Sequence, residues 1–172
     1  MKTMAIAVTM LLGFPALAQD TETKVGSWTV KKTVDSFSDA KRGISSTAMD
    51  PTKGIMLVKC DKPGAGSLYV SFLTPTYLGS DRIRAGINMA KFRFDEDAPE
   101  ALPRPRYDGR AAHLFDANAH KLLTQIMARK PARIRVQFVT YDSNYANVDI
   151  DVAGAAEAIK QTAVICEDAQ FQ

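Results

Sequence analysis

The sequence has 172 residues, of which 46% are hydrophobic and 24% are charged, and its formal net charge is +3. A nucleic-acid-binding protein would present a dense basic face, so this charge balance argues against a nucleic-acid partner. The composition is that of an ordinary globular protein. Residues 19–172 are long enough to form one domain with a core of its own.

Residues 1–18 have the features of a secretory signal peptide. Lys2 supplies a positive start, residues 4–14 are almost entirely apolar, and Pro15 breaks the run before the small-x-small cleavage site Ala16-Leu17-Ala18. The apolar run is too short to cross a bilayer, and no later stretch is long enough. We therefore expect a periplasmic or secreted protein that is cleaved near Ala18 and has no membrane insertion afterwards.

The chain has two cysteines, Cys60 and Cys166. In an oxidising compartment an isolated pair usually forms one bridge, which here would tie an early strand to the C-terminal segment. A redox or metal-binding pair is the alternative. It is the weaker one, because the chain has no Cys-x-x-Cys motif and two distant thiolates would need further ligands.

Short strands separated by turn residues dominate the chain. Alternating or continuous apolar patterns predict strands at residues 26–34, 44–49, 55–60, 68–72, 133–141 and 145–152, with weaker candidates at 83–87 and 91–94. The turns between them are rich in Asp, Gly, Pro and Asn. Regular spacing of this kind favours an antiparallel sheet.

The last two strands predict a hairpin with a defined register. A turn at residues 142–144 that is centred on Ser143 places Phe138 opposite Val148 and Arg135 opposite Asp151. Apolar pairs then share one face and opposite charges share the other, which is the pattern expected when one face is buried.

Two helices complete the expected fold. Apolar residues recur at helical spacing between Phe115 and Met127, with Asp116 as N-cap and Pro131 marking the end. Residues 155–165 predict a short helix that leads into Cys166. The sequence thus predicts an α+β fold: an antiparallel β-sheet or sandwich framework, one amphipathic helix, a short C-terminal helix and one disulfide.

Residues 95–110 form the longest stretch without apolar periodicity, and we interpret it as an exposed, Pro-rich loop. Arginines flanking an aromatic ring can bind phosphate, carboxylate or sugar acids, and a solubilising loop is the alternative. The candidate binding residues in and beside this loop are Arg93, Asp95, Arg104, Arg106, Tyr107 and Arg110.

No catalytic or metal-binding signature stands out. The chain has two histidines, His113 and His120, and lacks the further ligands that a zinc site needs. Nothing in the sequence supports a Ser-His-Asp arrangement, although the residue types for one are present. The acidic run at residues 95–97 lacks the geometry that paired catalytic carboxylates need. We predict no catalytic residue, metal or cofactor.

Several short motifs follow one another along most of residues 19–172. In chain order they are Trp28-Thr29-Val30, Leu57-Val58-Lys59-Cys60, the apolar strand Leu68 to Phe72, Leu78-Gly79, Arg93-Phe94-Asp95, Asp151-Val152-Ala153-Gly154, Ala158-Ile159 and the closing Cys166. This order resembles the VasI/TagO-type proteins, which are periplasmic accessory proteins associated with type VI secretion, and related proteobacterial exported proteins. The resemblance implies an accessory role and supplies no catalytic residue.

These observations favour a non-enzymatic exported protein that binds a protein or cell-envelope component and supports an envelope or secretion assembly. One alternative is a secreted inhibitor of a hydrolase such as lysozyme, which would insert the stiff loop at residues 99–110 into a cleft. Another alternative is an enzyme that acts on the cell wall.

Overall fold

The computed structural model describes residues 20–80, 90–102 and 105–172. The described strands are β1 Thr21–Val25, β2 Trp28–Val34, β3 Lys41–Asp50, β4 Gly54–Lys59, β5 Tyr69–Leu73, β6 Gly79–Ser80, β7 Lys91–Phe94, β8 Glu100–Ala101, β9 Arg106–Gly109, β10 Ala111–Leu114, β11 Arg133–Val139 and β12 Tyr145–Asp151. The helices are α1 Asp116–Arg129, α2 Ala155–Ile165 and the short 3-10 helix η1 Ala169–Phe171. The signal peptide, the strand candidate at 83–87 and Arg104 lie outside the described residues.

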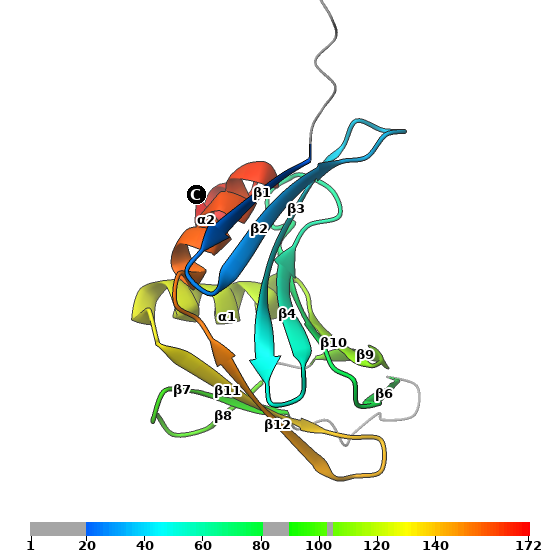
Figure 1. The fold of residues 1–172 in the computed structure, drawn as a ribbon, viewed down its shortest axis with the longest axis vertical. Coiled ribbons are helices and arrows are strands. Elements are labelled where there is room, and N and C mark those ends of the chain that lie inside the picture. Colours follow the sequence, from blue (N-terminus) through cyan, green and yellow to red (C-terminus); the bar gives the residue numbers. More distant parts are fainter. Residues whose placement is uncertain (1–19, 81–89, 103–104) are drawn as a thin grey trace, which may run out of the picture.

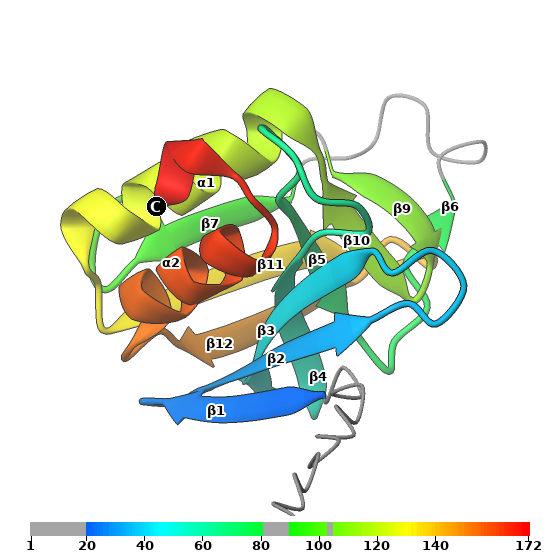
Figure 2. The same ribbon diagram turned by 90° about the horizontal axis from the view of Figure 1, so that it is seen from above.

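The strands form one antiparallel sheet that curves into a half-barrel around the two helices (Figures 1 and 2). The strand order is β6-β9-β10-β5-β4-β3-β12-β11-β7-β8, and β2 with β1 branches from β3. The predicted α+β class, with an antiparallel framework, an amphipathic helix, a short C-terminal helix and one disulfide, is confirmed. The sequence patterns missed five strands, β1, β6, β8, β9 and β10.

Strand β3 is long because one of its edges serves two neighbours. Its first part pairs with β2 and its last two residues, Met49 and Asp50, pair with β12. Thr47 lies where these partners diverge, and its buried hydroxyl donates to the carbonyls of Ser27 and Asp151, at 3.2 and 3.4 Å. One side chain thus satisfies backbone acceptors that the divided edge leaves without a ladder partner.

Apolar side chains of alternating strand positions fill the space between the concave face and the helices. Helix α2 packs on β2 and β3, and α1 packs on β5 and α2. The largest fully buried side chains include Trp28, Phe72, Phe94, Phe138, Leu122 and Leu123. Because the helices occupy the concave face, the other face of the sheet is the one left for solvent and ligands.

Helix α1 begins at Asp116, which is one residue earlier than predicted. The N-cap is Phe115, which has extended backbone and makes no side-chain capping bond, so the prediction of Asp116 as N-cap is wrong. The predicted apolar stripe is correct: Ala119, Leu122, Leu123 and Ile126 are buried. Lys130 ends the helix in the left-handed conformation, immediately before Pro131.

The β11–β12 hairpin forms, but two residues out of the predicted register. Phe138 faces Ala146 and Arg135 faces Asp149, where the predicted register placed Val148 and Asp151 opposite them. A shift of two preserves the buried face, so the apolar pattern cannot detect it. The turn decides it: Thr140 closes a five-residue loop by donating its N–H to the Asn144 carbonyl at 2.8 Å.

The predicted disulfide between Cys60 and Cys166 is present, with Cα atoms 6.0 Å apart across a sequence separation of 106. It joins the residue after β4 to the end of α2. Gly43 of β3 lies against it, and a Cβ there would come within 2.8 Å of the Cys166 sulfur. The absence of a side chain at Gly43 therefore lets α2 approach the sheet closely enough for the bridge.

We predict that Cys60→Ala with Cys166→Ala lowers the free energy of unfolding by about 3–5 kcal/mol. The bridge closes a long loop in the unfolded chain, and the unfolded chain regains that conformational entropy when the bridge is removed. Urea unfolding of the oxidised protein and of the double variant measures the difference. The wild-type protein in reductant should match the variant. A difference below about 1 kcal/mol would show that the α2–β3 packing holds the C-terminus without the bridge.

Candidate functional site

The structure separates the five candidate binding residues that it describes. Arg93 lies on β7, while Arg106 lies on β9 and Arg110 follows β9 at an exposed turn. Tyr107 is 2% exposed and belongs to the core, so its predicted role in an exposed cluster is wrong. The prediction of one exposed loop at residues 95–110 is also wrong for the described part, since β8 and β9 fall within it. Tyr107 points inward because it faces the buried Ala112 of β10.

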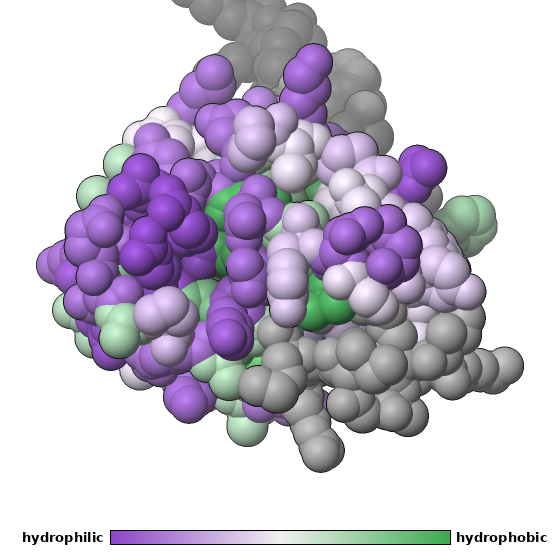
Figure 3. All heavy atoms as spheres, turned by 90° about the horizontal axis from the view of Figure 1, so that it is seen from below, coloured by the Kyte–Doolittle hydropathy of each residue, from purple (hydrophilic) through white to green (hydrophobic). Residues whose placement is uncertain are grey.

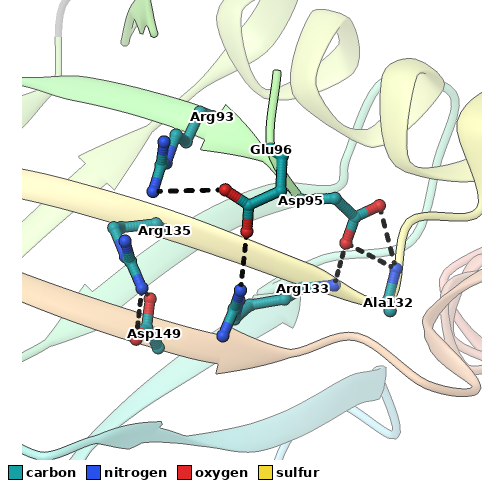
Figure 4. A network of polar contacts seen from close by, with 7 residues as sticks. All are labelled: Arg93, Asp95, Glu96, Ala132, Arg133, Arg135 and Asp149. Atoms are coloured by element: carbon teal, nitrogen blue, oxygen red, sulfur yellow. Dashed lines mark hydrogen bonds and ion pairs between the residues drawn. The ribbon is translucent and has the colours of Figure 1, made fainter. Parts of the chain in front are cut away.

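Asp95 is exposed, but its carboxylate is engaged in structural hydrogen bonds. Its carboxylate accepts hydrogen bonds from the backbone N–H groups of Ala132 and Arg133, at 3.1 and 2.9 Å (Figure 4). Its own N–H donates to the Arg133 carbonyl at 3.0 Å. Asp95 therefore fastens the end of β7 to the start of β11.

An ion-pair ladder crosses the outer face of β7, β11 and β12 (Figure 4). Arg135 donates twice to Asp149, at 2.6 and 3.0 Å, and Arg133 lies 3.2 Å from Glu96. The hydrogen bond from Arg135 lowers the pKa of Asp149 below its usual value. Seen from below, this end of the molecule is mostly hydrophilic, and hydrophobic side chains show only in gaps between polar ones (Figure 3).

A pocket of about 470 Å³ lies at the other end of the sheet, where β5, β9 and β10 run side by side. Its lining combines aromatic rings with both signs of charge: Asp61, Tyr69, Ser80, Arg106, Tyr107, Asp108, His113 and Phe115. Among the described members of the predicted binding cluster, Arg106 is the one that contributes an exposed side chain to it.

Tyr69 forms the floor of this pocket and is held from three sides. Its ring stacks on Phe115 with centroids 5.1 Å apart, and the Lys59 ammonium lies 5.0 Å from its centroid. Its hydroxyl donates to the Asp61 carboxylate at 2.7 Å. Burial, followed by the hydrogen bond to Asp61, raises the pKa of Tyr69 far above its usual value, so the phenol stays protonated.

His113 connects the pocket to a buried serine. Its Nδ1 lies 2.8 Å from the Ser71 hydroxyl oxygen, a separation typical of a nucleophile and its base. Burial lowers the pKa of His113, against the opposing effect of Asp108, so the ring is neutral at pH 7. Ser71 itself is 0% exposed, and a scissile carbonyl cannot reach it. The pair therefore satisfies a buried hydroxyl and leaves the other side of the imidazole toward the pocket.

The two histidines do not share a site. His120 lies on α1, where its ring meets Phe171 edge-on at 5.1 Å and its Nε2 is 3.9 Å from the buried Asp168. Among the described residues, no group of three or more His, Cys, Asp or Glu side chains could hold a metal ion. No helix in the same part of the chain has the length and apolar character to span a membrane.

Sequence reasoning did not identify Tyr69, Phe115, His113 and Asp61 as one site. Tyr69 and Ser71 lie on the opposite side of β5 from Val70 and Phe72, but all four residues are buried, so burial does not mark the two as part of a site. The element that was missed is β10, Ala111–Leu114, because these four residues directly precede a predicted helix and were not recognised as a strand. Without β10 beside β5, His113 has no neighbour to define it.

Comparisons with protein-family models, with curated proteins and with solved structures found no match to this chain.

We predict that the stability of the protein falls as pH drops from about 7 to 5, because the unfolded chain binds a proton at His113 before the folded one does. His113→Asn, which keeps a polar partner for Ser71, should flatten that slope. Thermal unfolding across this pH range provides the measurement. The carboxyl groups of Asp35 and Asp149 have lowered pKa values, so their protonation reduces the stability of the protein only at more acidic pH. An unchanged slope in the variant would contradict the assignment.

Proposed function

We propose that this chain is an exported binding protein without catalytic activity of its own, which recognises a protein or cell-envelope component through the Tyr69–Phe115 pocket. The observation that carries the proposal is the contrast between Ser71 and its surroundings. The serine hydroxyl is closed to solvent, whereas Arg106, Asp108 and Phe115 line an open pocket beside it. These groups are suited to recognition, and the hydroxyl is not placed for attack.

The chemistry of the pocket suits a mixed polar and apolar ligand. Phe115 keeps 37% of its surface exposed, although it already stacks on Tyr69. Aromatic and arginine side chains contribute most of the energy in many protein interfaces, above all where they are packed together. The positive Arg106 and the negative Asp108 lie on neighbouring alternate positions of β9, so the pocket offers both a donor and an acceptor.

Three observations support an exported role. The signal-peptide pattern of residues 1–18 is one, and the disulfide, a bond that persists in oxidising compartments, is the second. The resemblance to VasI/TagO-type accessory proteins is the third, and it suggests that the partner belongs to an envelope or secretion assembly. We propose a periplasmic or secreted location on these grounds.

A hydrolase inhibitor is the second candidate, because the β2–β3 hairpin carries a protruding side chain. Phe37 at its tip is 99% exposed. The carboxylate of Asp35 fixes the turn by accepting from the N–H groups of Phe37 and Ser38 and by pairing with Arg42 at 2.9 Å. A stiff loop with an apolar tip is how an inhibitor fills a cleft, and it replaces residues 99–110 as the inserting element of this hypothesis.

The two candidates predict opposite results from a matched pair of variants. Phe115→Ala removes the exposed ring of the pocket, and Phe37→Ala removes an exposed ring from the hairpin tip. We predict that crosslinking and affinity purification from the periplasm and medium of the source bacterium recover a partner with wild type and Phe37→Ala. Recovery with Phe115→Ala should fall by about tenfold or more, as for loss of an interface hot spot.

The reverse result, with binding lost only in Phe37→Ala, would support the inhibitor and overturn the pocket. Hydrolysis of cell-wall substrate by the purified protein, abolished by Ser71→Ala, would overturn the non-enzymatic proposal. Circular dichroism of each variant confirms that the fold is intact.

A further inference from the structure

A second hollow, far from the Tyr69–Phe115 pocket in the strand order, lies on the ion-pair face. It has a volume of about 200 Å³ and is lined by Lys91, Phe92, Arg93, Pro99, Arg135, Gln137 and Asn147. The basic side chains come from two neighbouring strands, β7 and β11, and Asn147 comes from β12. Pro99 is exposed and supplies an apolar rim, whereas Phe92 alternates with Lys91 and Arg93 along β7 and its ring belongs to the core on the other face.

The register places two arginines side by side here. Arg93 of β7 is the direct antiparallel partner of Arg135 of β11, and Lys91 is the partner of Gln137. Figure 4 shows Arg93 and Arg135 on the same face of the sheet. Like charges directly opposite one another destabilise a sheet, and here Asp149 beside Arg135 and Glu96 beside Arg93 offset part of that repulsion.

The nearby carboxylates neutralise this cluster unevenly. Asp149 is held by two hydrogen bonds from Arg135, which leaves it little capacity for other cations. Glu96 lies 3.2 Å from Arg133 but 4.0 Å from Arg93, so it belongs mainly to the former. Among the described residues, Lys91 has no ion-pair partner. Lys91 therefore faces the hollow with a charge that no described carboxylate pairs with, beside Arg93, whose ion pair with Glu96 is 4.0 Å long.

Amide groups complete the donor set. Gln137 donates through Nε2 to the Asn147 side-chain oxygen at 2.9 Å, which orients the Asn147 amino group away from that bond. An arginine, a lysine and a side-chain amide around an apolar-edged hollow match the planar, hydrogen-bonding shape of a carboxylate. A dianion such as phosphate fits less well, because Glu96 and Asp149 at the margin repel the second charge.

We propose that this hollow binds a carboxylate group, which Arg93 and Lys91 hold from two sides with the Gln137–Asn147 amide pair at its edge. The site is independent of the Tyr69–Phe115 pocket and stands whether or not that pocket has the function proposed above. Arg93 was predicted as a binding residue from the sequence, and in this proposal it binds from strand β7.

The test is an NMR titration of the ¹⁵N-labelled protein, expressed with its own leader, with sodium acetate, sodium phosphate and sodium chloride at matched ionic strength. Acetate should shift the Arg Nε–H and Gln137 side-chain amide signals saturably, and phosphate should bind more weakly. Arg93→Gln should raise the half-saturation concentration by about tenfold or more, the loss expected for a charge-assisted hydrogen bond, and Lys91→Gln should raise it by several-fold.

Arg42→Gln is the matched control, because Arg42 is another partly exposed arginine beside a carboxylate, on β3. It should leave acetate binding unchanged. Arg93→Gln should also unfold at the same or a higher temperature than wild type, since it removes the opposed charges. A lower temperature would assign Arg93 a structural role and count against the proposal. Lys91→Gln carries the test if Arg93→Gln does not fold.

Unsaturable shifts, equal shifts with chloride, or unchanged binding in both variants would overturn the proposal, and tighter binding of phosphate would overturn the choice of carboxylate. The same carboxylate can come from an acidic protein segment or from a uronic acid. Titration with N-acetylglutamate amide and with glucuronate distinguishes these two sources by their half-saturation concentrations.

Discussion

The packing of α1 and α2 into the concave face of the sheet is the constraint on which the rest of the structure depends. The helices pack on strands β1 to β5, and the disulfide anchors the end of α2 to the end of β4. The sheet therefore offers its other face, its edges and its turns, while a hollow of about 600 Å³ lies between the end of α1 and the start of α2. Both hollows described above, the Tyr69–Phe115 pocket and the Arg93–Lys91 site, use side chains that alternate with core residues along their strands.

Much of this fold can be predicted from local patterns. The stripe of Leu122, Leu123 and Ile126 defines α1 because a 3.6-residue period has few other interpretations, and the paired cysteines follow from compartment chemistry. The hairpin register could not be predicted, because a two-residue shift keeps every apolar side chain inside. The hydrogen bond from Thr140 to Asn144, which sets the loop length, leaves no periodic signal in the sequence.

The binding surfaces were harder to predict than the fold, for a physical reason. Arg106 and Tyr107 are adjacent in sequence, yet in strand β9 their side chains point to opposite faces. The predicted cluster of neighbouring residues therefore does not form. Conversely, Tyr69 and His113 are far apart in sequence and meet only because β5 pairs with β10. Sites assembled by strand pairing depend on long-range register, which is the least predictable property of an antiparallel sheet.

We propose that the face of the sheet opposite the helices is the recognition surface. Site-specific photocrosslinking in the native envelope tests it most directly, with the probe at Phe115 on the pocket and at Val164, an exposed position of α2. We expect a discrete crosslinked partner when the probe is at Phe115 and none when it is at Val164. A partner captured at Val164 and not at Phe115 would contradict it.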